Sequence, residues 1–178
     1  GVLMLDSPLI SGWRARSLEM AKRAQLVGAV SPGKISRKRR NLWTQREEAL
    51  ALFQSKKSFA RWHPQVLQDY VDHGLAEDAE QRITLYFTRE EETAIYNTLP
   101  HNLSALLRRH PLRCPAAFIG GLSSKEMKQV GMDMTLRITH GRITMLDGSH
   151  LFPMEQPEVT AAAIEASWLN LQAAARKP

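Results

Sequence analysis

One stretch near the carboxyl end decides the fold class: RITMLDGSHLFPMEQPEVTAAAIEASWL, residues 142–169. It begins with a short apolar, β-branched run, which predicts a buried strand. Pro157 and Glu158 indicate a helix start, because proline suits the first helical position and an acidic side chain suits the positive end of the helix dipole. His150 therefore lies in a loop between a strand and a helix. A neutral imidazole there can take up and return a proton near pH 7.

Two further apolar runs, residues 1–6 and 114–119, predict buried strands of the same kind. A helix is expected from Ser124 to Thr139, between the second and third strands, because Ser124 is a good cap and Gly141 a good stop. Strands that alternate with helices form parallel sheets. Asp6, directly after the first strand, would then stand at the carboxyl edge of the sheet, where catalytic groups gather.

A mainly helical block separates the first two strands. The spacing of apolar residues and the Pro and Gly punctuation predict helices over 17–30, 45–55, 64–73, 89–97 and 102–110, with a short strand at 82–87. We therefore divide the chain into residues 1–10 (strand and loop of a core), 11–100 (helical insertion) and 101–178 (the rest of the core).

Composition limits the classes of protein. With 178 residues, 43% of them hydrophobic, the chain is long enough for one sizeable domain or a part of a larger one. Cys114 is the single cysteine, so no internal disulfide is possible; we expect a buried thiol and a cytoplasmic setting. No apolar run approaches the roughly 20 residues needed to span a bilayer. The abrupt apolar start at Gly1 suggests a fragment whose sheet neighbours are missing.

The chain is basic, with a formal charge of +6 and a pI near 9.8. Most of the visible concentration is Arg37-Lys38-Arg39-Arg40. Such a run permits contact with nucleic acid, but a short run is usually a solvated face and no nucleic-acid-reading motif accompanies it. We keep a basic, nucleic-acid-binding helical domain as an alternative only.

The order strand, helical block, strand, helix, strand, helix, together with GSHLFPMEQP at 148–157, resembles the carboxyl-terminal half of an α/β-hydrolase-fold enzyme. The resemblance covers essentially the whole chain and corresponds to strand six, the cap domain, strands seven and eight and the last helix. It implies a partial α/β-hydrolase fold, with parallel strands and an inserted, mainly helical cap. It also implies that His150 is the histidine of a nucleophile, acid and histidine triad.

The nucleophile of this family sits on a Gly-x-Ser-x-Gly elbow before strand six. This sequence contains no such motif: the stretches GLSSK at 121–125 and GKIS at 33–36 lack the second glycine. The resemblance therefore implies that the elbow and much of the oxyanion hole precede Gly1. We expect the chain by itself to have no catalytic activity, because a general base without a nucleophile or oxyanion donors is only a small part of the catalytic site. Whether the chain alone is an enzyme stays open.

The acid of the triad departs from the common family pattern. Most members carry an aspartate after strand seven in a Gly-x-x-Asp pattern, and here Ser124 stands at that place. Some members, including haloalkane-dehalogenase-like ones, carry the acid after strand six, where Asp6 stands. We favour Asp6 and keep Glu126 as the alternative. Glu155, between two prolines, is expected to brace the turn.

The cap of this family covers an apolar acyl or alkyl pocket. Its candidate lining residues here are Trp13, Trp43, Trp62 and Phe152, although aromatic residues at helical spacing also serve as cap core. The remaining histidines show no metal-ligand spacing, so we expect neither a metal nor an organic cofactor.

The function that the resemblance implies is hydrolysis of a small-molecule ester or related acyl compound by the intact enzyme. An epoxide or carbon-halogen reaction would need an aspartate nucleophile instead. The alternative from a different class is a non-catalytic remnant or interaction module, which would associate with a complementary segment through the exposed edge of the first strand.

Overall fold

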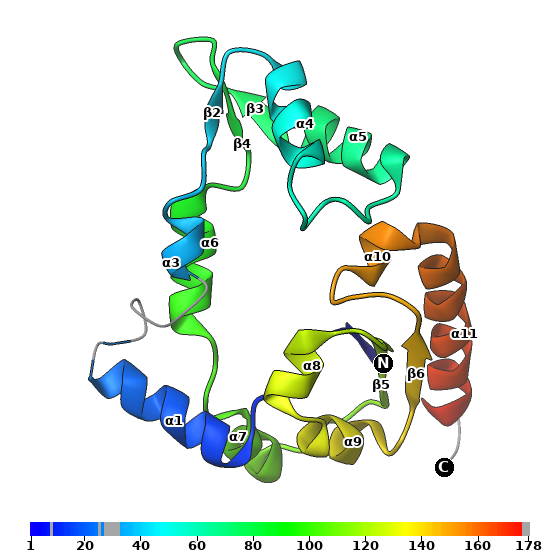
Figure 1. Cartoon of the computed structure of the whole chain (residues 1–178). Coiled ribbons are helices and arrows are strands. Elements are labelled where there is room, and N and C mark those ends of the chain that lie inside the picture. Colours follow the sequence, from blue (N-terminus) through cyan, green and yellow to red (C-terminus); the bar gives the residue numbers. More distant parts are fainter. Residues whose placement is uncertain (8, 25, 27–32, 176–178) are drawn as a thin grey trace. The chain divides into compact units, whose positions relative to one another are not determined.

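The computed structural model describes residues 1–7, 9–24, 26 and 33–175 (Figure 1). They divide into two compact units. The sheet unit consists of Gly1–Glu19 and Pro100–Pro178, and the helical unit consists of Met20–Leu99. The chain passes from the first unit to the second within helix α1 (Gly12–Arg23). Each unit is described by itself below.

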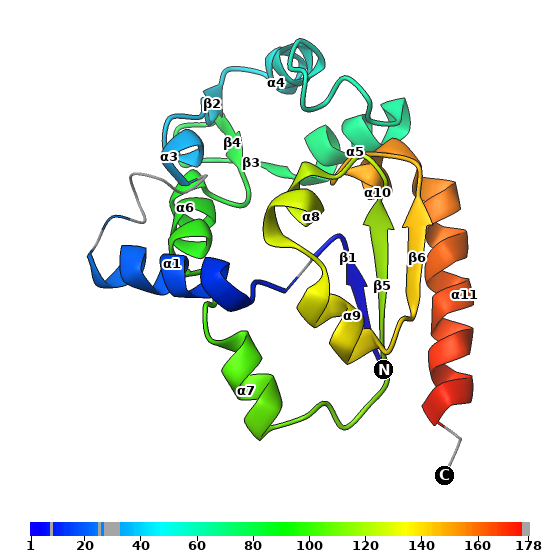
Figure 2. The same cartoon turned by 60° about the horizontal axis from the view of Figure 1, so that its bottom comes forward.

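The sheet unit is built on parallel strands. β1 (Val2–Leu5), β5 (Ala116–Gly121) and β6 (Ile143–Leu146) lie in the order β1-β5-β6, with Leu5 opposite Ile119 and Gly121 opposite Leu146. Every residue of the central strand β5 is buried, as expected for a parallel strand covered on both faces. The fold class predicted from the alternation of strands and helices is confirmed, and Figure 2 shows the three strands side by side.

Helices cover both faces of this sheet. Figures 1 and 2 show α8 (Lys125–Val130) and α9 (Asp133–Thr139) on one side and α11 (Pro157–Ala175) on the other. α7 (Leu103–Arg109) precedes β5, and the short α10 (Phe152–Glu155) precedes α11. The core between these layers contains the fully buried side chains of Phe118, Ile119, Phe152 and Leu171.

The helical unit contains short helices and a small antiparallel sheet. Its strands β2 (Leu42–Trp43), β4 (Ile83–Leu85) and β3 (Leu75–Glu77) lie in that order. Its helices are α3 (Gly33–Ser36), α4 (Arg46–Gln54), α5 (Pro64–His73) and α6 (Arg89–Thr98). A buried cluster joins the small sheet to α4 and α5: Trp43, Ala49, Phe53, Leu67, Val71, Leu75, Ile83 and Leu85.

Local sequence explains two helix starts in this unit. Thr88 and Glu91 form a capping box, in which the Thr88 hydroxyl accepts from the Glu91 N–H and the Glu91 carboxylate accepts from the Thr88 N–H. Pro64 opens α5, as predicted, and the His63 ring accepts from the Gln65 N–H.

Several expectations from the sequence are wrong. All three core strands were expected to be buried, but β1 and β6 contain no buried residue, and only β5 is buried along its length. The helix expected from Ser124 to Thr139 is two helices, because Gly131 adopts a φ of +81° and ends α8. The described residues of the helical block contain three strands rather than one, since strands of two or three residues are too short to show an alternating pattern. Cys114 is exposed, because the buried part of the strand begins only at Ala116.

The first helix also differs from its predicted range. The sequence predicted a helix over 17–30, whereas α1 begins at Gly12 and ends at Arg23. Residues 25 and 27–30 of that prediction lie outside the described residues. A search of the helices in the described ranges finds none with the length and apolar character needed to cross a membrane.

Candidate functional site

The site is built where the strands of the sheet unit end. Asp6 follows β1 directly and has a φ of +41°, a left-handed conformation that aspartate tolerates better than most residues. Its backbone N–H still donates to the carbonyl oxygen of Ile119 at 2.8 Å, which continues the pairing with β5. Because the carboxyl ends of parallel strands share one edge, Asp6 meets the loops that follow β5 and β6 there.

The Asp6 carboxylate is buried, with 1% of its side chain exposed, and both oxygens are hydrogen bonded. Oδ1 accepts from the Gly121 N–H at 2.9 Å, and Oδ2 accepts from the Ser124 hydroxyl at 2.6 Å. Bonds to an ionised acceptor are short and strong, and a buried carboxylate needs them to offset its lost hydration. The end of β5 and the start of α8 therefore hold the Asp6 carboxylate in place.

His150 completes the group. Its Nδ1 lies 2.6 Å from Asp6 Oδ2, although the two residues are 144 positions apart in the sequence. A carboxylate oxygen can only accept, so the Nδ1 of this ring carries the hydrogen and Nε2 is left as the basic nitrogen of the neutral form. The side chain of His150 is 42% exposed, whereas that of Asp6 is buried. The ring thus has one protein-facing nitrogen and one available to a reactant.

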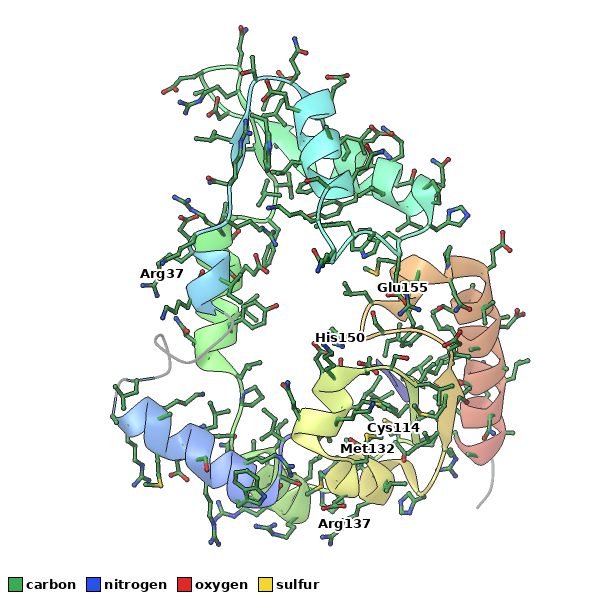
Figure 3. The ribbon with its side chains drawn as sticks, in the orientation of Figure 1. Arg37, Cys114, Met132, Arg137, His150 and Glu155 are labelled. Atoms are coloured by element: carbon green, nitrogen blue, oxygen red, sulfur yellow. The ribbon has the colours of Figure 1, made fainter. Side chains whose placement is uncertain are left out.

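The loop that carries His150 is braced by Glu155, as the sequence predicted. The Glu155 carboxylate accepts from the N–H of Ser149 at 2.9 Å and from its hydroxyl at 2.6 Å. The hydroxyl oxygen of Ser149 also accepts from the Leu151 N–H at 3.1 Å. Both neighbours of His150 in the chain, Ser149 and Leu151, are therefore held by hydrogen bonds. Figure 3 labels His150 on this loop and Glu155 on the helix that follows it.

Two glycines allow the loop to approach the sheet. A Cβ on Gly121 would lie 2.3 Å from the carbonyl oxygen of Ser149, and a Cβ on Gly148, whose φ is +138°, would lie 2.7 Å from Phe152 Cβ. Neither distance is compatible with a larger residue unless the backbone moves. The close packing that brings His150 to Asp6 therefore depends on glycine at both places.

Glu126, the alternative acid, is placed differently. Its Oε2 lies 3.5 Å from the Ser124 hydroxyl, and among the described contacts none joins it to the His150 ring. Ser124 itself caps α8 by accepting from the Met127 N–H at 3.2 Å. The structure thus brings Asp6, not Glu126, to His150 Nδ1. The sequence reasoning missed that Ser124 would bond to this carboxylate; its position as an N-cap was the available signal.

Asp6, Glu126 and His150 also offer three ligand atoms that lie within 4.8 Å of one another, as a cation site requires. A cation that used Asp6 Oδ2 and His150 Nδ1 would replace the 2.6 Å hydrogen bond between them. The first atom also receives the Ser124 hydroxyl. The hydrogen bonds from Ser124 and His150 satisfy the Asp6 carboxylate without an ion.

The four candidate pocket residues lie in different surroundings. Phe152 is fully buried in the core of the sheet unit, and Trp43, 2% exposed, belongs to the core of the helical unit. Trp62 packs on Phe59, with ring centroids 4.7 Å apart. Trp13 is 68% exposed. Packing in a core therefore accounts for Phe152 and Trp43, as it does for most aromatic residues at helical spacing.

Comparison with known proteins finds no matching protein-family model and no matching curated protein. Solved structures do match. They include the peroxisomal α/β-hydrolase Lpx1 from Saccharomyces cerevisiae (TM-score 0.58, 15% identity, 97% of this chain and 44% of that one). They also include the thioesterase domain from the curacin biosynthetic pathway (0.59, 13%, 91% and 56%) and an esterase of M. tuberculosis (0.55, 13%, 92% and 52%).

At this level of identity the likeness shows the fold, and that fold is the α/β-hydrolase fold. The chain spans about half the length of the solved structures that it matches. The resemblance inferred from the order of elements is therefore confirmed for the fold.

Proposed function

We propose that this chain supplies the histidine and the acid of a hydrolase triad, with His150 as the base and Asp6 as the residue that orients it. The observation that carries the proposal is the 2.6 Å contact between His150 Nδ1 and a buried Asp6 carboxylate at the carboxyl edge of the sheet. An acid in this place holds one ring tautomer and stabilises the imidazolium that forms during the reaction.

The chemistry follows from that tautomer. His150 Nε2 takes the proton of an attacking hydroxyl as that oxygen bonds to the substrate carbonyl, and the imidazolium then gives the proton to the departing alcohol oxygen. In the second half, Nε2 takes a proton from water as water attacks the acyl group, and returns it to the nucleophile. Asp6 stays ionised throughout and faces Nδ1.

The nucleophile belongs to the part of the fold that these 178 residues do not span. The sequence has no Gly-x-Ser-x-Gly elbow, and the proposal assigns that elbow and the oxyanion donors to a further segment, covalently joined or separate. The helical unit takes the place of the cap in this proposal. Esters and related acyl compounds are the proposed substrates, in keeping with the esterase and the thioesterase among the structural neighbours.

The test compares variants in a protein in which these residues are combined with a nucleophile elbow, with p-nitrophenyl acetate as substrate. Replacing His150 by Ala should lower kcat by about 10³-fold or more, since a triad is lost with its base. His110→Ala, an exposed histidine of the same unit with an ordinary backbone conformation, is the matched control. Asp6→Asn should lower kcat strongly and Glu126→Gln only slightly. Near-normal turnover of the His150 variant would exclude the triad role, and the reverse order of the two acid variants would exclude Asp6.

One observation supports a second role, as an association module. Among the described strands, β1 pairs with β5 and has no partner on its other side. The N–H groups of Val2 and Asp6 donate toward β5, so the N–H groups of Leu3 and Leu5 face the open edge. Such an edge accepts another strand. In a binding assay with a segment carrying the preceding strand, Leu3→Pro should abolish association and Leu3→Val should not; equal binding of both variants would exclude this edge.

A further inference from the structure

The helical unit contains a cavity of about 630 Å³, a size within the roughly 300–1,000 Å³ of small-molecule sites. It forms between α3, the residues that follow it, and the end of α4 with its following turns. Its lining is Lys34, Ile35, Lys38, Arg39, Arg40, Leu52, Phe53, Lys56, Ser58 and Phe59. All of these residues belong to one compact unit, and none takes part in the proposed triad.

One wall of the cavity is apolar. Phe53 and Phe59 are stacked, with ring centroids 4.9 Å apart, and Leu52 packs against the same cluster. Ile35, on α3, lines the same cavity and is 76% exposed, although it is one of the most hydrophobic residue types. An exposed isoleucine beside stacked aromatic rings is apolar surface that a ligand would remove from water.

Most of the other lining residues are basic. Five of the ten lining residues are lysine or arginine, and no carboxylate is among them. Arg39 pairs with Glu92 at 3.2 Å and Arg40 with Glu48 at 3.1 Å, so two of these charges are neutralised. In the part of the chain that the structure describes, Lys34, Lys38 and Lys56 form no ion pair. Three exposed lysines with no ion pair among the described residues therefore contribute to the lining of a mainly apolar cavity.

The same contacts argue against a nucleic-acid surface. Of the basic run at 37–40, Arg39 and Arg40 are engaged by carboxylates. Arg46, the next arginine, donates to the carbonyl oxygens of Val71, Asp72 and Leu75. The first two are carbonyl groups at the end of α5, which need hydrogen-bond donors from outside the helix. Lys34, Lys38 and Lys56 line one cavity, whereas a nucleic-acid backbone needs a charged groove that follows its phosphates.

From this combination we infer that the cavity binds a single-chain amphiphile with an anionic headgroup, such as an alkyl phosphate or a fatty acid. The chain lies against Ile35, Phe53 and Phe59, and the headgroup is held by Lys34, Lys38 and Lys56. Tight binding needs both parts of the ligand. The apolar contacts remove the alkyl chain from water, and the lysines select an anionic headgroup.

Isothermal titration of this chain with dodecyl phosphate, below its micelle concentration, tests the inference. We expect binding at least tenfold tighter than that of dodecyl maltoside, which has the same chain and no charge, and tighter by a similar factor than that of inorganic phosphate. Equal binding of the maltoside would reduce the site to an apolar patch, and equal binding of phosphate would reduce it to an anion site. Either result overturns the inference.

Charge-reversal variants locate the site. Lys38→Glu/Lys56→Glu should weaken dodecyl phosphate binding at least tenfold, and Ile35→Asp should do the same without disturbing the core, since Ile35 is exposed. Lys57→Glu is the matched control, because Lys57 is adjacent in sequence, exposed and absent from the lining; its affinity should change less than twofold. An equal loss in the control would indicate a diffuse charge effect and refute the site.

A competing oligonucleotide separates the remaining alternative. Single-stranded DNA is added to the complex with dodecyl phosphate. If the DNA displaces dodecyl phosphate, and if Lys57→Glu weakens DNA binding as much as Lys38→Glu does, the surface binds polyanions and the inference is overturned. None of these measurements involves turnover. Their outcome is therefore independent of whether the chain takes part in hydrolysis.

Discussion

Replacing Asp6 by Asn should destabilise the sheet unit and change the tautomer of His150. Three donors converge on the two carboxylate oxygens: the Gly121 N–H at 2.9 Å, the Ser124 hydroxyl at 2.6 Å and His150 Nδ1 at 2.6 Å. An amide of the same shape accepts on one side only. Whichever way the asparagine is turned, its NH₂ group faces at least one of these donors.

The magnitude follows from the two fully buried bonds. A hydrogen bond to a charged group stabilises a protein by about 1.5–3 kcal/mol and a neutral one by about 0.5–1.5 kcal/mol, so each of these bonds weakens by about 1 kcal/mol when the charge is removed. We leave out the bond to His150, because that side chain is 42% exposed. The NH₂ group that faces a donor adds to this loss. Asp6→Asn should therefore lower the free energy of unfolding of the sheet unit by about 2–3 kcal/mol.

Native-state amide exchange of the β5 amides measures this change for the sheet unit alone. Asp147→Asn is the matched control: Asp147 is an exposed carboxylate of the same unit, and its change should stay within about 0.5 kcal/mol. The ¹⁵N shifts of the His150 ring provide a second measurement. The proton should be on Nδ1 in the parent chain and on Nε2 in the variant, where the asparagine NH₂ donates to Nδ1. A loss below about 0.5 kcal/mol together with an unchanged ring would refute the described bonding of Asp6.

Three further predictions concern the supports of the site and the helical unit. Gly121→Ala should cost about 1–3 kcal/mol and displace the His150 loop, because its Cβ would lie 2.3 Å from the Ser149 carbonyl oxygen; loss of the ring contact to Asp6 in the ¹⁵N spectrum would report it. Glu155→Gln should speed amide exchange at Ser149 and Leu151, since one carboxylate oxygen that accepts from Ser149 becomes a donor, and Glu165→Gln, an exposed change in α11, should leave it unaltered. Burial raises the pKa of Tyr70 above its ordinary value of 10, with a smaller opposing effect from Arg39, so the helical unit should keep its stability below pH 10 and lose part of it as the pH rises through the Tyr70 pKa; Tyr70→Phe should remove that loss in alkaline unfolding curves.

The parts of the fold that could be predicted are those with a strong local signal. β5 and β6 are continuous apolar runs, and α11 has a proline start, so their identity was evident from the sequence. The break between α8 and α9 was not predicted, because a single glycine in a helical pattern is often tolerated and only its φ of +81° shows that it ends the helix. β4 falls within the strand predicted at 82–87, whereas β2 and β3 were not predicted, because strands of two or three residues leave no alternating pattern and β2 depends on its pairing with the distant β4.

The candidate site was predictable in its residues but not in its contacts. His150 and Asp6 were named from their places after strands, and the common edge of parallel strands explains why those places meet. The bond from Ser124 to Asp6 joins residues 118 positions apart and could not be read from spacing. The role of Gly121 was equally hidden, since it depends on the Ser149 carbonyl oxygen that approaches it from another loop.

The bond between Ser124 and Asp6 gives a physical reason for a serine at position 124. Ser124 Oγ lies 2.6 Å from Asp6 Oδ2, in a place where both side chains are buried. A carboxylate at position 124 would put a second negative charge against the first, and two such charges do not both stay ionised at that distance. A hydroxyl instead donates to Asp6 and accepts from the Met127 N–H at 3.2 Å. With the Asp6 carboxylate after β1, a residue at 124 that donates to it avoids this repulsion, and serine can do so while it caps α8.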